Sequence, residues 1–203
     1  MMEHVPPDRR KAVLDAAFRV FVTYGFRRTT MADIAEAAGI SRPALYLVFK
    51  SKSEIYLAGF IDMLEDIRLN VRRAFAAAPD FKSGLLDAID AAVLAPHRMI
   101  AGTPHGAELF TLGEHVQSGL GEQWYAAIEA ELEAAIREQV AAGRLDLSML
   151  GLTPDRFARL IMSSIEGIKS RMTSIDEAAA DMILLVNVMC HALENGSTHP
   201  AQA

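Results

Sequence analysis

The 203-residue chain contains a single cysteine, Cys190, and no apolar run that approaches the length of a membrane span. One thiol cannot form a disulfide within the chain, which favours a reducing compartment. A membrane-spanning helix needs about 20 predominantly apolar residues, and the first ten residues lack the apolar core of a secretory signal. These absences predict a cytoplasmic protein without a membrane partner.

Motifs of catalysis are absent as well. The chain has no Gly-x-Ser-x-Gly, no His-Glu-x-x-His, no phosphate-binding loop and no dinucleotide fingerprint. His97, His105 and His115 follow one another at eight and ten residues, which are not the spacings of metal ligands on a helix. We therefore expect no enzyme activity, no metal and no cofactor.

The charge of the chain is unevenly distributed. Residues 1–56 hold nine Lys or Arg against six Asp or Glu, a net charge of +3. The whole chain carries −6, so the remainder carries −9. A small basic module on an acidic body indicates a localised contact with nucleic acid rather than general binding of polyanions.

Apolar residues recur at helical spacing along most of the chain, and strand signals are few. Leu14, Ala17, Phe18 and Phe21 form one such stripe. Helices are expected from the cap at Asp8 to Gly25, and over about 31–38, 42–49, 52–75, 81–95, 122–142, 153–173 and 174–194. The glycine-rich segment 97–121 is expected to break into short pieces.

This pattern predicts an all-α protein of about nine helices. A helix-turn-helix DNA-binding domain is expected over residues 8–56, with its motif at 30–49. A helical effector-binding and dimerisation domain is expected over 57–196. Residues 1–7 and 197–203 are expected to be loose tails.

The motif at residues 30–49 has the composition of two short helices that cross closely. Ile34, Ala35 and Leu45 can form a small core between them, and Gly39 can make the tight turn. The second helix would project its N-terminal residues outward, and an α-helix fits the major groove of DNA.

The side chains that this motif exposes suit DNA. Arg42 can offer two donors to guanine, while Pro43 and Ala44 can touch a thymine methyl group. Hydroxyl or ammonium groups suited to phosphates are carried by Thr30, Ser41, Tyr46 and Lys52. We expect the first set to read bases and the second to fix the register on the backbone.

The segment Thr30-x3-Ile34-Ala35-x2-Ala38-Gly39-Ile40-Ser41-x3-Leu45-Tyr46-x2-Phe49-x2-Lys52 resembles the TetR family of repressors, as does Tyr24-Gly25-Phe26 upstream. The resemblance covers about residues 9–60. It implies an all-helical homodimer with a three-helix DNA-binding domain and a larger ligand-binding domain. It also implies DNA-contacting positions at Thr30, Arg42, Pro43, Tyr46 and Lys52. Many members have Gly in place of Pro43 and His in place of Val48, and the second change removes a possible phosphate contact.

The last two expected helices are too apolar to be exposed on most of their surface, so a partner surface is expected in addition to the core. We expect two helices per chain to form a dimeric four-helix bundle, with a monomer built around a central helix as the alternative. The residues expected at this interface are Phe157, Leu160, Ile161, Ser164, Ile168, Leu185, Met189 and Leu193.

A sensor pocket is expected in the same part of the chain, since Met and aromatic side chains suit an adaptable apolar cavity. Ordinary core packing is the alternative for each of them. The candidate lining residues are Phe60, Met63, Leu64, Met99, Phe110, Trp124, Tyr125, Met162 and Glu166. Together they favour an apolar or aromatic effector. A polar anchor is one interpretation of Glu166, and a solvated or interface residue is the favoured one.

Three functions remain open from the sequence. The first is a repressor that binds a palindromic operator as a dimer and is released by a small molecule. The second is a DNA-binding regulator without small-molecule input. The third is a helical interaction protein, or an enzyme, that uses the helix-turn-helix corner without DNA.

Overall fold

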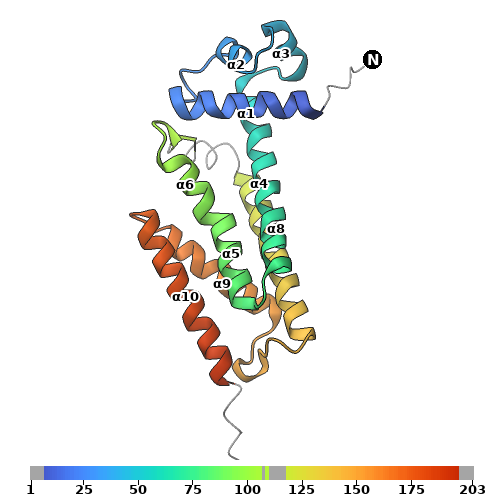
Figure 1. The fold of residues 1–203 in the computed structure, drawn as a ribbon, viewed down its shortest axis with the longest axis vertical. Coiled ribbons are helices and arrows are strands. Elements are labelled where there is room, and N and C mark those ends of the chain that lie inside the picture. The colour runs from blue at the N-terminus through green and yellow to red at the C-terminus, as the bar shows by residue number, and fades with distance from the viewer. Residues whose placement is uncertain (1–6, 107, 110–117, 197–203) are drawn as a thin grey trace, which may run out of the picture. The chain divides into compact units, whose positions relative to one another are not determined.

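A computed structural model describes residues 7–106, 108–109 and 118–196 (Figure 1). These residues form helices and connecting turns, with no strand among them, so the predicted all-α class is confirmed. None of the described helices is long and apolar enough to span a membrane. The expected tails fall almost wholly on residues outside the described ranges, except that Pro7 already belongs to a helix.

The chain divides into two compact units, and helix α4 contributes to both. The first unit comprises residues 1–66 and 99–121, and the second comprises 67–98 and 122–203. The predicted domain boundary at residue 56 falls inside α4 (Lys52–Ala77), which continues without a break. The first unit also takes in residues 99–121, which the sequence placed with the effector domain.

The first unit is built from α1 (Pro7–Tyr24), α2 (Met31–Ala37), α3 (Arg42–Val48) and the first part of α4. Figure 1 shows α2 and α3 lying together on one side of α1. Val13, Ile34, Leu45 and Ile55 are completely or almost completely buried and join these helices in one core. The expected cap residue Asp8 lies one residue inside α1, because the helix begins at Pro7.

The second unit packs α5 (Phe81–Ile89), α9 (Pro154–Lys169) and α10 (Ile175–Gly196) together, with α8 (Ser118–Ala141) and the second part of α4. Phe81 lies 6.0 Å from Phe75 and 6.1 Å from Phe157, measured between ring centroids. A short 3-10 turn, Ser148–Leu150, precedes α9. Thr153 takes the extended backbone of an N-cap and Pro154 opens α9, as expected from the Thr-Pro-Asp signal.

One expectation about the helices was wrong. The helix that begins at Phe81 was expected to end before Pro96, because proline cannot donate a backbone hydrogen bond. Instead, the helical path continues through a π-helical turn at Asp90–Leu94 into α6 (Ala95–Ala101). The extra residue of a π-turn shifts the backbone pairing there, and Pro96 lies in the first turn of α6, where a missing N–H costs little.

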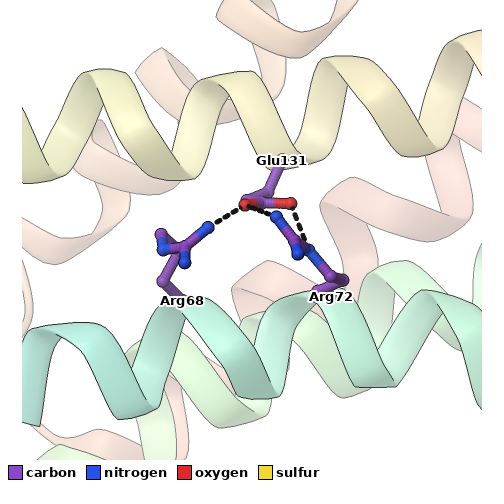
Figure 2. Close-up of polar contacts among 3 residues, drawn as sticks. All are labelled: Arg68, Arg72 and Glu131. Carbon is purple, nitrogen blue, oxygen red and sulfur yellow. Dashed lines mark hydrogen bonds and ion pairs between the residues drawn. The ribbon is translucent and has the colours of Figure 1, made fainter.

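An ion cluster joins α4 to α8 within the second unit. Figure 2 shows Glu131 of α8 between Arg68 and Arg72, which lie one turn apart on α4. Arg72 donates from Nε at 2.9 Å and from Nη2 at 2.5 Å to the two oxygens of Glu131, and Arg68 donates to Oε1. The Glu131 side chain is only 12% exposed. The hydrogen bonds from Arg72 outweigh the effect of burial and, with Arg68, lower the pKa of this carboxyl.

This cluster predicts an acid-sensitive part of the stability. A carboxyl whose pKa is lowered by folding stabilises the protein above its unfolded pKa, about 4.3, and that contribution disappears as the pH falls through the folded value. In urea unfolding at pH 7 and fixed protein concentration, Glu131→Gln should lose about 1–3 kcal/mol. The gap to wild type should narrow as the pH falls below the unfolded pKa and close once it has fallen through the lowered folded pKa, because the wild-type carboxyl is then also neutral.

Glu133→Gln is the matched control, since Glu133 pairs with Arg137 one turn along the same helix. Such surface pairs contribute about 0.3–0.5 kcal/mol. An equal loss in both variants, or a gap at Glu131 that persists in acid, would contradict the assignment.

Candidate functional site

The turn between α2 and α3 has the geometry that a helix-turn-helix requires. Gly39 has φ +65°, a left-handed conformation that side chains resist. Its N–H donates to the Glu36 carbonyl at 3.0 Å, and the Ile40 N–H donates to the Ala35 carbonyl at 3.0 Å. Ala35 is buried where the helices meet. The turn therefore fixes the direction in which α3 leaves α2.

Both short helices are capped at their N-termini by predicted DNA-contacting residues. The Thr30 hydroxyl accepts from the Asp33 N–H at 3.3 Å, and Asp33 accepts from the Thr30 N–H at 2.7 Å. The hydrogen bonds from Thr30 lower the pKa of the Asp33 carboxyl. Ser41 Oγ accepts from the Ala44 N–H at 3.3 Å. Each cap holds a seven-residue helix whose length alone would not make it stable.

The outer surface of α3 brings the predicted base-reading residues together. Arg42, Pro43 and Tyr46 are exposed, and Ala44 is partly exposed. The Arg42 guanidinium lies 5.6 Å from the centre of the Tyr46 ring, and its Nη2 is 3.5 Å from the Tyr46 hydroxyl. The ring thus supports the guanidinium at the exposed face of the helix.

The sequence interpretation missed one residue of this surface. Leu47 is 73% exposed, more than any other large apolar side chain among the described residues. It lies on α3 outside the Leu45 core position. An exposed aliphatic side chain on such a helix suits contact with a thymine methyl group. The sequence did contain a signal for Leu47. On a helix, a residue two positions after the buried Leu45 faces away from the core.

Lys52 has a role that differs from the expected phosphate contact. Its ammonium donates to the carbonyls of Phe26 at 2.7 Å, Thr29 at 2.9 Å and Arg27 at 3.0 Å. It also lies 4.7 Å from the centre of the Phe26 ring. An ammonium has three N–H donors, so these carbonyls use all of them. In this structure Lys52 fixes the loop that leads from α1 to α2, and its phosphate contact stays a prediction.

Comparisons with known proteins agree on this region. Residues 13–58 match the model of the bacterial regulatory proteins, tetR family. The transcriptional activator FasR of Mycolicibacterium smegmatis is 38% identical over 84 residues, which are 41% of this chain and 38% of FasR. The regulator EthR of the same species is 30% identical over 146 residues, 66% of this chain and 64% of EthR. Residues 13–58 therefore belong to the TetR family.

Solved TetR-family structures extend the likeness in fold over nearly the whole chain. SmeT, the repressor of a multidrug efflux pump of Stenotrophomonas maltophilia, covers 93% of this chain with a TM-score of 0.59 at 18% identity, over 91% of its own length. A TetR-family regulator from Mesorhizobium loti covers 91%, with a TM-score of 0.69 at 15% identity, over 96% of its length. In sequence, the matched region spans less than two fifths of the first curated relative. The curated relatives of this chain are helix-turn-helix transcriptional regulators.

A small apolar cavity lies inside the second unit. Its volume is about 40 Å³, and Trp124, Tyr125 and Met162 of the expected set line it. The other lining residues are Val71, Phe75, Leu85, Ala88, Ile89, Ala92, Val93, Ile128, Leu132, Ile165 and Lys169. Glu166 does not line it but accepts a hydrogen bond from the Tyr125 hydroxyl.

The remaining pocket candidates lie elsewhere. Phe60, Met63 and Leu64 belong to the first unit, and so does Met99, which is 52% exposed. Phe110 lies outside the described residues. The sequence could not separate these positions from the cavity, because α4 and α6 each contribute residues to both units.

The expected dimer residues divide into a buried set and a set that is exposed or partly buried. Phe157, Ile161 and Leu193 are at most 7% exposed and pack into the core of their own chain, which corrects their assignment to a partner surface. Leu160 is 46% exposed, and Ser164, Ile168, Leu185 and Met189 are partly buried. The expected interface set did not include three exposed apolar side chains of α10: Ile183, Leu184 and Val188. Helix α10 has apolar residues on most of its surface. The spacing of apolar residues in the sequence therefore did not reveal which face is buried.

Because Lys52 binds three loop carbonyls, its replacement should destabilise the fold rather than remove a contact with a DNA phosphate. Lys52→Met should lower the urea-unfolding free energy by about 1–3 kcal/mol, because charge-assisted hydrogen bonds to three carbonyls are lost. Any weaker DNA binding should leave the dependence of log K on log salt unchanged. A lost phosphate contact would instead reduce that slope by about 0.9. Lys50→Met, at an exposed neighbour, should keep wild-type stability.

Proposed function

We propose that the protein is a transcriptional regulator that binds a twofold-symmetric operator as a homodimer and responds to a small apolar effector. The observation that carries the proposal is the exposed face of α3, where Arg42 stands on the Tyr46 ring at the start of a capped helix. Arg42 pairs with guanine, and Pro43, Ala44 and Leu47 contact neighbouring bases through apolar groups. Thr30, Ser41 and Tyr46 bind phosphates.

The dimer is supported by the apolar surface of α9 and α10. Leu184 and Val188 lie one turn apart on α10 and are 61% and 59% exposed. On α9, Leu160 is exposed beside the small residues Ser164 and Gly167, which allow close approach of another helix. A second copy would cover the same patch on both chains, as twofold symmetry requires. Two α3 helices could then reach half-sites about 34–36 Å apart.

Response to a small molecule is supported by the cavity and by α4. Val71 and Phe75 of α4 line the cavity, whereas Ile55 and Tyr56 of the same helix pack against the helix-turn-helix core. Arg68 and Arg72 tie the cavity half of α4 to α8 through Glu131. An effector that forces α4 and α8 apart would act against this cluster and shift α4. Such an effector must bind the DNA-competent and DNA-incompetent states with different affinities.

The DNA-binding part is tested by a gel-shift assay with the DNA immediately upstream of the gene. We expect sequence-specific, salt-sensitive binding by the wild type. Arg42→Ala should weaken it by about 1–3 kcal/mol and relax the preference at one base pair, because a bidentate base contact is lost. Arg144→Ala, at an exposed position of the second unit, is the matched control and should bind as wild type.

The proposal fails if binding is indifferent to sequence and salt, or if Arg42→Ala binds with unchanged affinity and preference. The alternative without effector remains distinct, since it retains DNA binding but predicts no ligand in the second unit.

A further inference from the structure

Two residues of the cavity lining, Tyr125 and Lys169, form a polar cluster with Glu166. Lys169 is the one charged residue among the described residues that line the cavity. Its ammonium donates to Glu166 Oε2 at 2.9 Å and lies 5.9 Å from the centre of the Tyr125 ring. The Tyr125 hydroxyl donates to the same carboxylate oxygen. Lys169 therefore contributes to the cavity lining, whereas its partner Glu166 does not.

The protonation of this cluster follows from its contacts. Burial opposes the charged form of Glu166, but the hydrogen bonds from Tyr125 and Lys169 outweigh it and lower the pKa of the carboxyl. Burial and the neighbouring carboxylate raise the pKa of the Tyr125 hydroxyl. At neutral pH the cluster thus contains a carboxylate, an ammonium and a neutral phenol, with no net charge.

This neutrality limits what an apolar cavity can accept. A ligand with a charge of its own would place an uncompensated charge beside apolar walls, which costs free energy. A neutral ligand avoids that cost. One N–H of the Lys169 ammonium binds Glu166, and an ammonium carries two more that can donate to an acceptor inside the cavity.

We infer that the effector is a neutral, mainly apolar molecule with a carbonyl acceptor, such as a ketone, an ester or a lactone, held by Lys169. This inference rests on the proposed ligand response and names its chemistry. The carbonyl accepts from Lys169, and the apolar body displaces side chains around Met162. A cavity of about 40 Å³ is far smaller than the roughly 150 Å³ that holds benzene, so binding must widen it. The flexible thioether of Met162 is a wall that can move.

Three probes of matched size test the inference: cyclohexyl methyl ketone, cyclohexanecarboxylate and cyclohexylmethylamine. Trp124 is the only tryptophan of the chain and lines the cavity, so its fluorescence reports binding without DNA. We expect the ketone to bind at least tenfold more tightly than either charged probe. Lys169→Met should weaken the ketone by about tenfold, and Lys82→Met, on α5 outside this cavity, should not.

Removal of the negative charge of Glu166 gives a second test, because it should change which probe binds best. Glu166→Gln leaves Lys169 uncompensated, so the preference should move at least tenfold toward the carboxylate. Glu129→Gln, which removes a carboxylate of α8 outside the cavity lining, should keep the wild-type order.

Three outcomes would overturn the inference. They are tighter binding of a charged probe by the wild type, an unchanged ketone affinity in Lys169→Met, and no saturable change of Trp124 fluorescence with any of the three probes. Retention of sequence-specific DNA binding in the gel shift would show that only the ligand assignment had failed. If the three probes bind in the expected order of affinity but sequence-specific DNA binding is absent, the proposed regulatory function fails and the ligand assignment stands.

Discussion

Helix α4 is the constraint on which both units depend, because its 26 residues serve two cores in succession. Its first residue, Lys52, fixes the loop before α2, and Ile55 closes the helix-turn-helix core. Further along, Arg68 and Arg72 hold Glu131, and Val71 and Phe75 form a cavity wall. An α-helix has no break in its backbone hydrogen bonds at which these two sets could separate cheaply. A single helix therefore carries residues of the helix-turn-helix core and of the cavity wall.

The helix-turn-helix shows how a few contacts orient a recognition helix. Gly39 sets the turn, Thr30 and Ser41 cap the two helices, and Lys52 holds the preceding loop. These contacts fix the backbone, so little flexibility remains in the position of Arg42. The Tyr46 ring then supports the guanidinium itself. Preorganisation of this kind lowers the entropic cost of binding DNA.

The sequence could predict this first unit closely, because its rules are local. Caps, a turn glycine and an apolar stripe each act over a few residues, and the expected starts of α2, α3 and α4 agree with the structure. The role of Lys52 was not predictable in this way. Its acceptors lie 23 to 26 residues away, and a lysine at a helix start has the same appearance in a phosphate site.

The second unit was harder to predict because its features depend on packing between distant helices. The sequence pointed to Trp124, Tyr125 and Met162 by residue type, but only the fold separates them from Met63 and Met99. Likewise, α10 is apolar on both faces, so Leu193 and Leu184 could not be distinguished until one was found buried and the other exposed. Glu131 offered no signal at all, since its partners come from another helix.

The central claim, a symmetric pair of α3 helices on DNA, is tested most directly by selection from random-sequence DNA. The wild type should enrich an inverted repeat whose half-site centres lie about one helical turn apart. Leu184→Glu, which places a charge on the exposed face of α10, should sediment as a monomer and enrich no repeat, while Val140→Glu on α8 should behave as wild type. Enrichment of an unsymmetric site by the wild type, or of the same repeat by Leu184→Glu, would contradict the account.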